Sequence, residues 1–193
     1  MKFKNKSLQI SCDGGAATGK STGAKMLSKK YNLKFLSSGL LYRYAAYLII
    51  RNKPKNKINF LKKNFKNLNY KKLEKIDLHT QQISEIASKI AKIYKIRIIL
   101  KKYQVNFAKK YNNCCIEGRD ISTKILPSSN VKFYFVCDLD IAAKRRYREL
   151  KKISPHIKLK DVKNSLKIRN KADINRKNSP LLKHRDSIEI DTG

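Results

Sequence analysis

The chain has 193 residues, of which 41% are hydrophobic, and this is enough apolar material for the core of one folded domain. No stretch approaches the roughly twenty apolar residues of a membrane span, and residues 1–6 lack the apolar segment of a signal peptide, so we expect a cytoplasmic protein. The net charge of +32 comes mostly from lysines scattered along the chain beside many asparagines. Because no basic stripe carries interleaved aromatic residues, we expect solvated surface and no specific nucleic-acid partner.

The first predicted strand, over residues 7–13, leads directly into a glycine-rich loop. Residues 14–21 fit the pattern G-x-x-x-x-G-K-[ST], and residues 20–31 follow with helical spacing of apolar side chains. The alternative is an ordinary glycine turn, but a strand, a loop and a helix start are the parts of an anion site. In such a loop the lysine, here Lys20, reaches the β- and γ-phosphates, and the Ser21 hydroxyl ligates Mg²⁺. We assign to the nucleotide-phosphate site Gly14, Gly15, Ala16, Ala17, Thr18, Gly19, Lys20, Ser21 and Thr22.

The middle of the chain changes composition twice. Residues 34–39 are typical of a short strand ending in a turn, and residues 40–50 form a strongly apolar predicted helix. Residues 51–75 carry ten Lys or Arg against a single Glu, and we expect a hydrophilic insertion with two short strands around Phe65 and Tyr70.

Helical spacing returns after this insertion. A helix is expected to start at the possible cap formed by residues 77–80 and to run to Ala91, and a further helix to span residues 94–110.

The last third alternates again between strands and helices. Strands are predicted over residues 113–118, 131–138 and 187–191, and helices over residues 141–152 and 159–171. The near-continuous apolarity of residues 131–138 indicates burial on both faces, as in a parallel sheet. The alternation predicts a three-layer α/β domain whose site lies at the carboxyl ends of the strands.

The four cysteines all lie in apolar, strand-like runs, with no C-x-x-C pair and no histidine at ligand spacing. We expect buried thiols, and neither disulfides nor zinc, at Cys12, Cys114, Cys115 and Cys137.

Arginines and polar residues gather after the predicted strands. Ser38 and Arg43 follow the second strand, and Arg119 and Asp120 follow the third. An arginine-dense helix, with Arg145, Arg146 and Arg148, follows the fourth strand. Residues of this kind at strand ends predict a second anion site and a closing lid.

Several motifs together resemble the bacterial cytidylate (CMP) kinases, a family of nucleoside-monophosphate kinases. The resemblance runs almost end to end. It rests on the glycine loop, on S-G-x-x-Y-R at residues 38–43, on G-R-D at residues 118–120 and on R-x-x-x-D-x-N-R at residues 169–176. Ser37 and Glu117 depart from it, since the family usually has Asp at both positions.

The resemblance implies a role for each matching residue. Ser38 and Arg43 would hold the acceptor phosphate, and Ser88 and Arg97 would contact the cytosine edge. Arg119 would hold phosphate, and Asp120 would help to read the base. Arg169 and Asp173 would contact the ribose, and Arg176 would lie over the phosphates. The implied catalytic residues are Lys20, Arg119 and Arg176, and the implied CMP-binding residues are Ser38, Arg43, Ser88, Arg97, Arg119, Asp120, Arg169 and Asp173.

The resemblance also implies a P-loop kinase fold with a central parallel sheet, a shortened insertion on the side of the nucleoside monophosphate, and a helical lid. We expect a single domain with its core in residues 1–50, 77–144 and 177–193, the insertion at about 51–76 and the lid at about 145–176. The implied reaction is ATP-dependent phosphorylation of CMP and dCMP with Mg²⁺. Nothing in the sequence demands an oligomer, so we expect a monomer, and we expect no membrane partner.

Two other functions are compatible with the glycine loop alone. One is a P-loop kinase for another small acceptor, against which the joint presence of Ser88, Arg97, Arg119 and Asp173 argues. The other is a basic, nucleic-acid-binding P-loop protein without kinase turnover, which would bind nucleic acid in a strongly salt-dependent way.

Overall fold

The computed structural model describes residues 7–193, so the expectation that residues 1–6 lack a signal segment lies outside the described residues. The chain forms two compact units: the first combines the chain up to Leu36 with Asn112–Gly193, and the second is Ser37–Tyr111. None of the helices formed by residues 7–193 has the length and apolarity of a membrane span.

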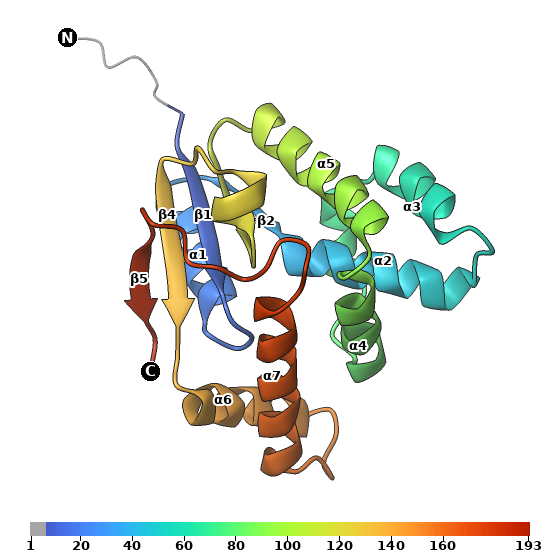
Figure 1. Cartoon of the computed structure of the whole chain (residues 1–193), viewed down its shortest axis with the longest axis vertical. Helices are drawn as coiled ribbons and strands as arrows, with labels where there is room; N and C mark the ends of the chain where they lie inside the picture. The colour runs from blue at the N-terminus through green and yellow to red at the C-terminus, as the bar shows by residue number, and fades with distance from the viewer. Residues whose placement is uncertain (1–6) are drawn as a thin grey trace. The chain divides into compact units, whose positions relative to one another are not determined.

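The first unit is built on a five-stranded sheet. Its strands follow the order β2-β3-β1-β4-β5, and β1 pairs in parallel with β3 and with β4, as does β4 with β5 (Figure 1). The bounds of the strands are β1 Gln9–Gly14, β2 Lys34–Ser37, β3 Cys114–Gly118, β4 Val131–Val136 and β5 Ile188–Asp191. The predicted parallel α/β fold is therefore confirmed.

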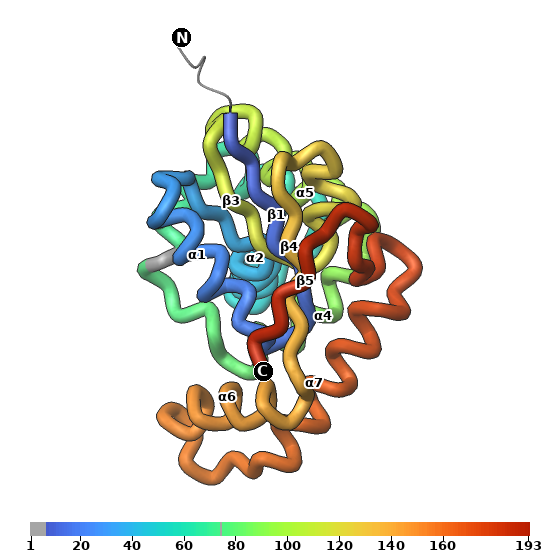
Figure 2. Tube along the Cα trace, turned by 90° about the vertical axis from the view of Figure 1, so that its left-hand side faces the viewer, coloured from blue at the N-terminus to red at the C-terminus, as the bar shows by residue number. Residues whose placement is uncertain are grey.

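The two faces of the central strand β1 carry different side chains, because successive residues of a strand point to opposite faces. Ile10 and Cys12 join an apolar core with Ala24 of α1, Lys20–Lys30, which packs on this face (Figure 2). Ser11 and Asp13 point the other way. Both are buried, and both form hydrogen bonds with the segment that follows β3. That segment contains a single π-helical turn, Ile121–Ile125, which the sequence did not indicate.

The two helices of the expected lid also belong to the first unit. They are α6, Leu139–Lys151, and α7, Leu159–Ile174. Buried side chains from both, including Ala143 and Leu166, form one apolar cluster with Ala16 of the glycine loop. The two helices predicted over residues 141–152 and 159–171 are confirmed, and α7 extends past residue 171 to include Asp173. Their role as a lid stays a prediction.

The second unit is helical. It consists of α2 Ser38–Asn52, α3 Lys57–Lys66, a 3₁₀ turn Tyr70–Lys75, α4 Gln81–Ile90 and α5 Tyr94–Lys110. The prediction for α5 is confirmed at both ends, and Thr80, within the expected cap, accepts a hydrogen bond from the Ile83 N–H at the start of α4.

The prediction of two strands around Phe65 and Tyr70 is wrong, since the structure has a helix and a 3₁₀ turn there. Phe65 lies in α3, because the Asn56 side chain caps that helix by accepting from the Asn59 N–H at 3.0 Å. Leu61 and Phe65 then fall four residues apart on one buried face of the helix. The strand predicted over residues 34–39 is shorter than expected and ends at Ser37. The Ser37 hydroxyl caps α2, which begins at Ser38.

Candidate functional site

The glycine loop joins the end of β1 to the start of α1. Gly14 approaches β4 so closely that a Cβ there would lie 2.4 Å from the Phe135 carbonyl oxygen. Gly19 caps α1 with a φ of 72°, in the left-handed region that glycine adopts without strain. Both glycines are therefore required by the backbone path, which turns from the strand into a helix N-terminus.

Lys20 lies in the first turn of α1 with only 8% of its surface exposed. Its ammonium donates to the Gly15 carbonyl at 3.0 Å and lies 4.0 Å from the Glu117 carboxylate. Burial, reinforced by the nearby Arg119 guanidinium, lowers the pKa of Lys20 to about 7. A phosphate beside this ammonium would supply the negative charge that favours its protonated form.

Arg119 follows β3 and lies against the same loop. Its guanidinium donates to the Gly14 carbonyl at 2.6 Å and to the Gly15 carbonyl at 3.2 Å. Its Nε donates to the Asp173 carboxylate at 2.8 Å, which ties the strand end to α7. The structure thus brings Arg119 and Asp173 together beside the loop.

Asp173 also pairs with Arg176, whose guanidinium lies 3.4 Å from its Oδ1 and 3.8 Å from Asp120. Burial would raise the pKa of Asp173, but Arg119, Arg176 and Arg169 outweigh it, so the pKa is lowered and the carboxylate stays charged. Lys20 and the three arginines therefore lie among the carboxylates of Glu117, Asp120 and Asp173 beside the loop, an excess of positive charge suited to an anion.

Asp13, to which the sequence analysis gave no role, holds the turn after Arg119 and Asp120 in place. Its fully buried carboxylate accepts from the Ile121 N–H at 2.8 Å, from the Ser122 N–H at 2.8 Å and from the Ser122 hydroxyl at 2.6 Å. Burial raises the pKa of Asp13 to about 6, although these hydrogen bonds favour the charged form. A carboxylate at the end of an apolar strand was the only signal for it.

Two further side chains touch the loop and were also missed. The Asn170 amide oxygen of α7 accepts from the Ala16 N–H at 2.9 Å. The Thr192 hydroxyl donates to the Thr18 carbonyl, 3.0 Å away. Neither residue belongs to a local pattern that could have been read from the sequence.

The three arginines predicted for the lid have different surroundings. Arg145 donates to the hydroxyl of Thr192 at 3.2 Å and so reaches the loop indirectly. Arg146 pairs with Glu149 on its own helix at 2.8 Å, and Arg148 is exposed. Only Arg145 is thus linked to the glycine loop.

The second unit carries four of the predicted acceptor residues. Ser38 is buried in the first turn of α2, and a Cβ on Gly39 would lie 3.8 Å from the Arg43 guanidinium, which therefore folds back over the N-terminus of this helix. A helix N-terminus with a cation beside it favours a bound anion. This is the chemistry expected of a phosphate-binding pair.

Arg97 is 6% exposed at the start of α5. Its guanidinium donates to the Ala91 carbonyl at 3.2 Å and lies 5.6 Å from the ring centre of Tyr42, which the sequence analysis did not assign. Ser88 is half-buried on α4.

The described cysteine side chains are free thiols; Cys12, Cys114 and Cys115 are buried, and Cys137 is half-buried.

The chain is similar to known proteins over nearly its whole length. The family model described as cytidylate kinase matches residues 10–193. Cytidylate kinases from Bartonella tribocorum and Rickettsia canadensis are each 36% identical, over 95% of this chain and 86% and 84% of theirs. The cytidylate kinase of Clostridium botulinum strain Hall is 35% identical over 96% of this chain and 90% of its own.

One solved structure, an uncharacterized protein from Eubacterium ventriosum, shares the fold. It has a TM-score of 0.54 and 17% identity, and the match covers 96% of this chain and 90% of that one. The match of the family model to nearly the whole chain, with relatives at about 35% identity, is decisive. The chain belongs to the cytidylate kinase family.

Proposed function

We propose that the protein transfers the γ-phosphoryl group of ATP to CMP and dCMP, giving CDP and dCDP. The observation that carries the proposal is the buried group of cations beside the glycine loop, in a chain of this family. Lys20 and Arg119 both donate to the loop carbonyl of Gly15, and Arg119 and Arg176 share the carboxylate of Asp173.

Phosphoryl transfer needs positioning and charge neutralisation more than covalent chemistry from the protein. The N–H groups of residues 14–22 and the Lys20 ammonium would hold the donor phosphates, while Arg119 and Arg176 would stabilise the charge on the transferred group. Asp173 and Asp13 would hold these arginines and their turn ready before the nucleotide binds. We assign no general base.

For the acceptor, we propose that Ser38 and Arg43 bind the phosphate and that Ser88, Arg97 and Asp120 read the cytosine edge. An arginine and a carboxylate can distinguish the amino group of cytosine from the carbonyl of uracil, since the wrong base would leave a buried polar group unpaired. Arg169 and Asp173 would contact the ribose. Arg145, Arg146 and Arg148 remain proposed lid residues, with Arg145 the best placed of the three.

Mg²⁺ fits the residues present. The Ser21 side chain is exposed in the first turn of α1 and makes no hydrogen bond within the described part of the chain, so its hydroxyl could ligate the ion. Mg²⁺ commonly takes few protein ligands and keeps waters and substrate phosphates. When bound with ATP, it would supply charge neutralisation at the phosphates.

The reaction would take place in the cytoplasm, where ATP and nucleoside monophosphates occur, and a monomer would suffice. The test is ADP release from ATP and Mg²⁺ with CMP, dCMP, UMP, AMP and GMP offered separately. Turnover with CMP and dCMP, and little with the purines, is expected. Turnover with none of the five, or a preference for a purine, would contradict the proposal.

A further inference from the structure

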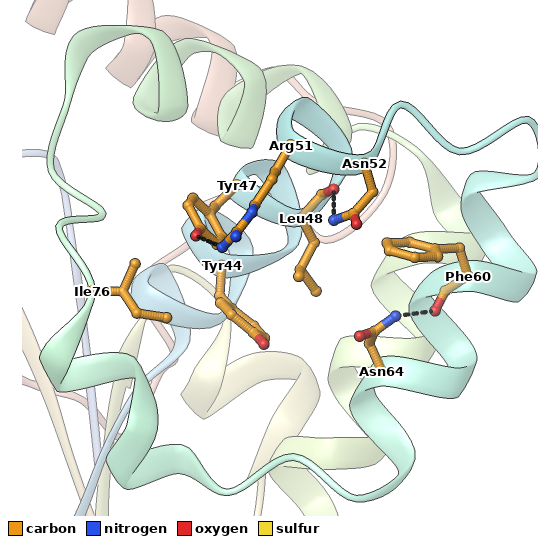
Figure 3. A pocket seen from close by; sticks show the side chains of 8 residues that line it. All are labelled: Tyr44, Tyr47, Leu48, Arg51, Asn52, Phe60, Asn64 and Ile76. Carbon is orange, nitrogen blue, oxygen red and sulfur yellow. Dashed lines mark hydrogen bonds between the residues drawn. The ribbon is translucent and has the colours of Figure 1, made fainter.

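A cavity of about 370 Å³ opens within the second unit, between α2, α3 and the segment around Ile76 (Figure 3). Its volume lies within the range of roughly 300–1,000 Å³ typical of small-molecule sites. None of the acceptor residues assigned above lines it, so it is distinct from them. The lining residues are Tyr44, Tyr47, Leu48, Arg51, Asn52, Phe60, Asn64 and Ile76.

Aromatic side chains supply much of the cavity wall. The rings of Tyr44 and Tyr47 lie 6.3 Å apart at an interplanar angle of 19°, one turn apart on α2. Tyr44 is held in turn by Phe65, at 5.9 Å between ring centres. Phe60 of α3 faces them from across the cavity in Figure 3. Walls of this kind favour a flat, ring-shaped ligand, which can stack against the faces of the tyrosines.

Two asparagine side chains give the cavity a polar specificity. The amide nitrogens of Asn52 and Asn64 donate to the carbonyls of Leu48 and Phe60, each at 2.9 Å. These bonds fix the orientation of both amides, so that each oxygen is left as an acceptor. No side chain or backbone group among the described residues donates to either oxygen, and the oxygen of Asn64 points into the cavity (Figure 3). Two fixed acceptors call for a ligand that carries hydrogen-bond donors, such as an amino group.

Arg51 provides a positive charge at the edge. Its guanidinium donates to the Tyr47 hydroxyl at 2.7 Å and lies 5.9 Å from the centre of that ring. The tyrosine thus holds the exposed guanidinium in place while other N–H groups stay available. Among the side chains that the structure describes, no acidic residue lines the cavity and none forms an ion pair with Arg51. An anionic group on the ligand is therefore expected at this edge.

We propose that this cavity binds an amino-substituted nucleobase, stacked on the tyrosines with its amino group on the asparagine oxygens, and the phosphate of the same nucleotide on Arg51. The proposal goes beyond the acceptor and donor sites and does not depend on them.

The test follows the side-chain amide signals of Asn52 and Asn64 by NMR in the ¹⁵N-labelled full chain. AMP, adenosine and purine riboside, which lacks the amino group, are the probes. Both amide signals are expected to shift in a saturable way with AMP and adenosine, and AMP to bind about tenfold more tightly through its phosphate. Purine riboside should bind about tenfold more weakly than adenosine. Absence of saturable shifts at both amides, or equal binding of purine riboside and adenosine, would overturn the proposal.

A matched pair of variants tests Arg51. Arg51→Gln should reduce the affinity for AMP to that for adenosine and leave CMP phosphorylation unchanged. Arg185→Gln removes the same charge at a side chain that is 90% exposed outside the cavity, and should leave AMP binding unchanged. Equal weakening in the two variants would show a general charge effect and would refute the assignment.

Discussion

The two units of the molecule hold their functional side chains in different ways. In the first unit the contacts join residues far apart in sequence: Arg119 reaches Asp173, 54 residues on, and Asp13 reaches Ser122, 109 residues on. In the second unit, Arg97 donates to a carbonyl six residues away, and Arg51 to a tyrosine four residues away. The first site is a network of charged groups that share partners, whereas the second unit combines short-range hydrogen bonds with ring contacts between helices, such as that of Arg97 with Tyr42.

This difference indicates where the effect of a substitution should extend to other residues and where it should stay local. Charged groups of the first unit share partners, so that the loss of one changes the charge and position of the others. Substitutions in the second unit should change the binding of the ligand that the side chain contacts and little else.

Lys20→Met should have the largest effect, because it removes the ammonium beside the loop while keeping most of the side-chain volume. We expect kcat for CMP phosphorylation to fall by roughly 10²–10³-fold or more with the fold intact, as loss of a preorganised charge does elsewhere. Steady-state kinetics and circular dichroism give the measurement. Lys29→Met, at an exposed position of the same helix, is the control. Unchanged kinetics in Lys20→Met would refute the site assignment.

Asp173→Ala should weaken the binding of the acceptor nucleotide more than the binding of ATP. The change removes the partner shared by Arg119 and Arg176, and hydrogen bonds to charged groups contribute about 1.5–3 kcal/mol, so the KM for CMP should rise by roughly tenfold or more. Asp186→Ala, at an exposed carboxylate, should behave as wild type. An equal rise in the KM of both nucleotides would contradict a role at the ribose.

ATP binding should take up a proton above neutral pH. The pKa of Lys20 is lowered to about 7, so the side chain is largely neutral near pH 8 in the free protein and becomes charged beside a phosphate. The affinity should then fall by up to about tenfold per pH unit above 7. Calorimetry near pH 8 in buffers of different ionisation enthalpy should show uptake of up to one proton. Lys20→Met should abolish it; uptake that persists in this variant would come from another group.

Asp13→Asn should lower kcat by roughly tenfold, since the amide cannot accept from both the Ile121 and Ser122 N–H groups and an unpaired buried donor costs about 1–3 kcal/mol. The turn after Arg119 and Asp120 would then shift. Ser122→Ala removes only the hydroxyl bond and should remain close to wild type in kcat and in Tm. Identical kinetics for the two variants would show that the backbone bonds to Asp13 do not position the site.

The sequence was sufficient for those parts of the first unit that have local signals. The glycine loop has a fixed pattern, and the apolar run over residues 131–138 indicates a parallel strand. The structure has this strand as β4, which ends at Val136 and is only partly buried. Asp13, Asn170 and Thr192 could not be assigned, because their roles arise only when β1, α7 and the chain end meet at the loop. Such contacts leave no local pattern.

The second unit was predicted less well for a different reason. Its lysine- and asparagine-rich stretch hides a short helix, in which only Leu61 and Phe65 are buried and the cap residue Asn56 is one asparagine among several. The role of Tyr42 against Arg97 depends on how α2 and α5 pack, and helical spacing within one segment could not show it.

The most direct test of the contrast between the units is the discrimination between CMP and UMP in Arg97→Met, set beside Arg119→Met. If Arg97 reads the cytosine edge and Arg119 acts on the transferred phosphoryl group, Arg97→Met should lower kcat/KM for CMP far more than for UMP, with the KM for ATP unchanged. Arg119→Met should lower kcat/KM for both acceptors alike. Equal losses for CMP and UMP in Arg97→Met would contradict the account, because base selection would then not depend on Arg97.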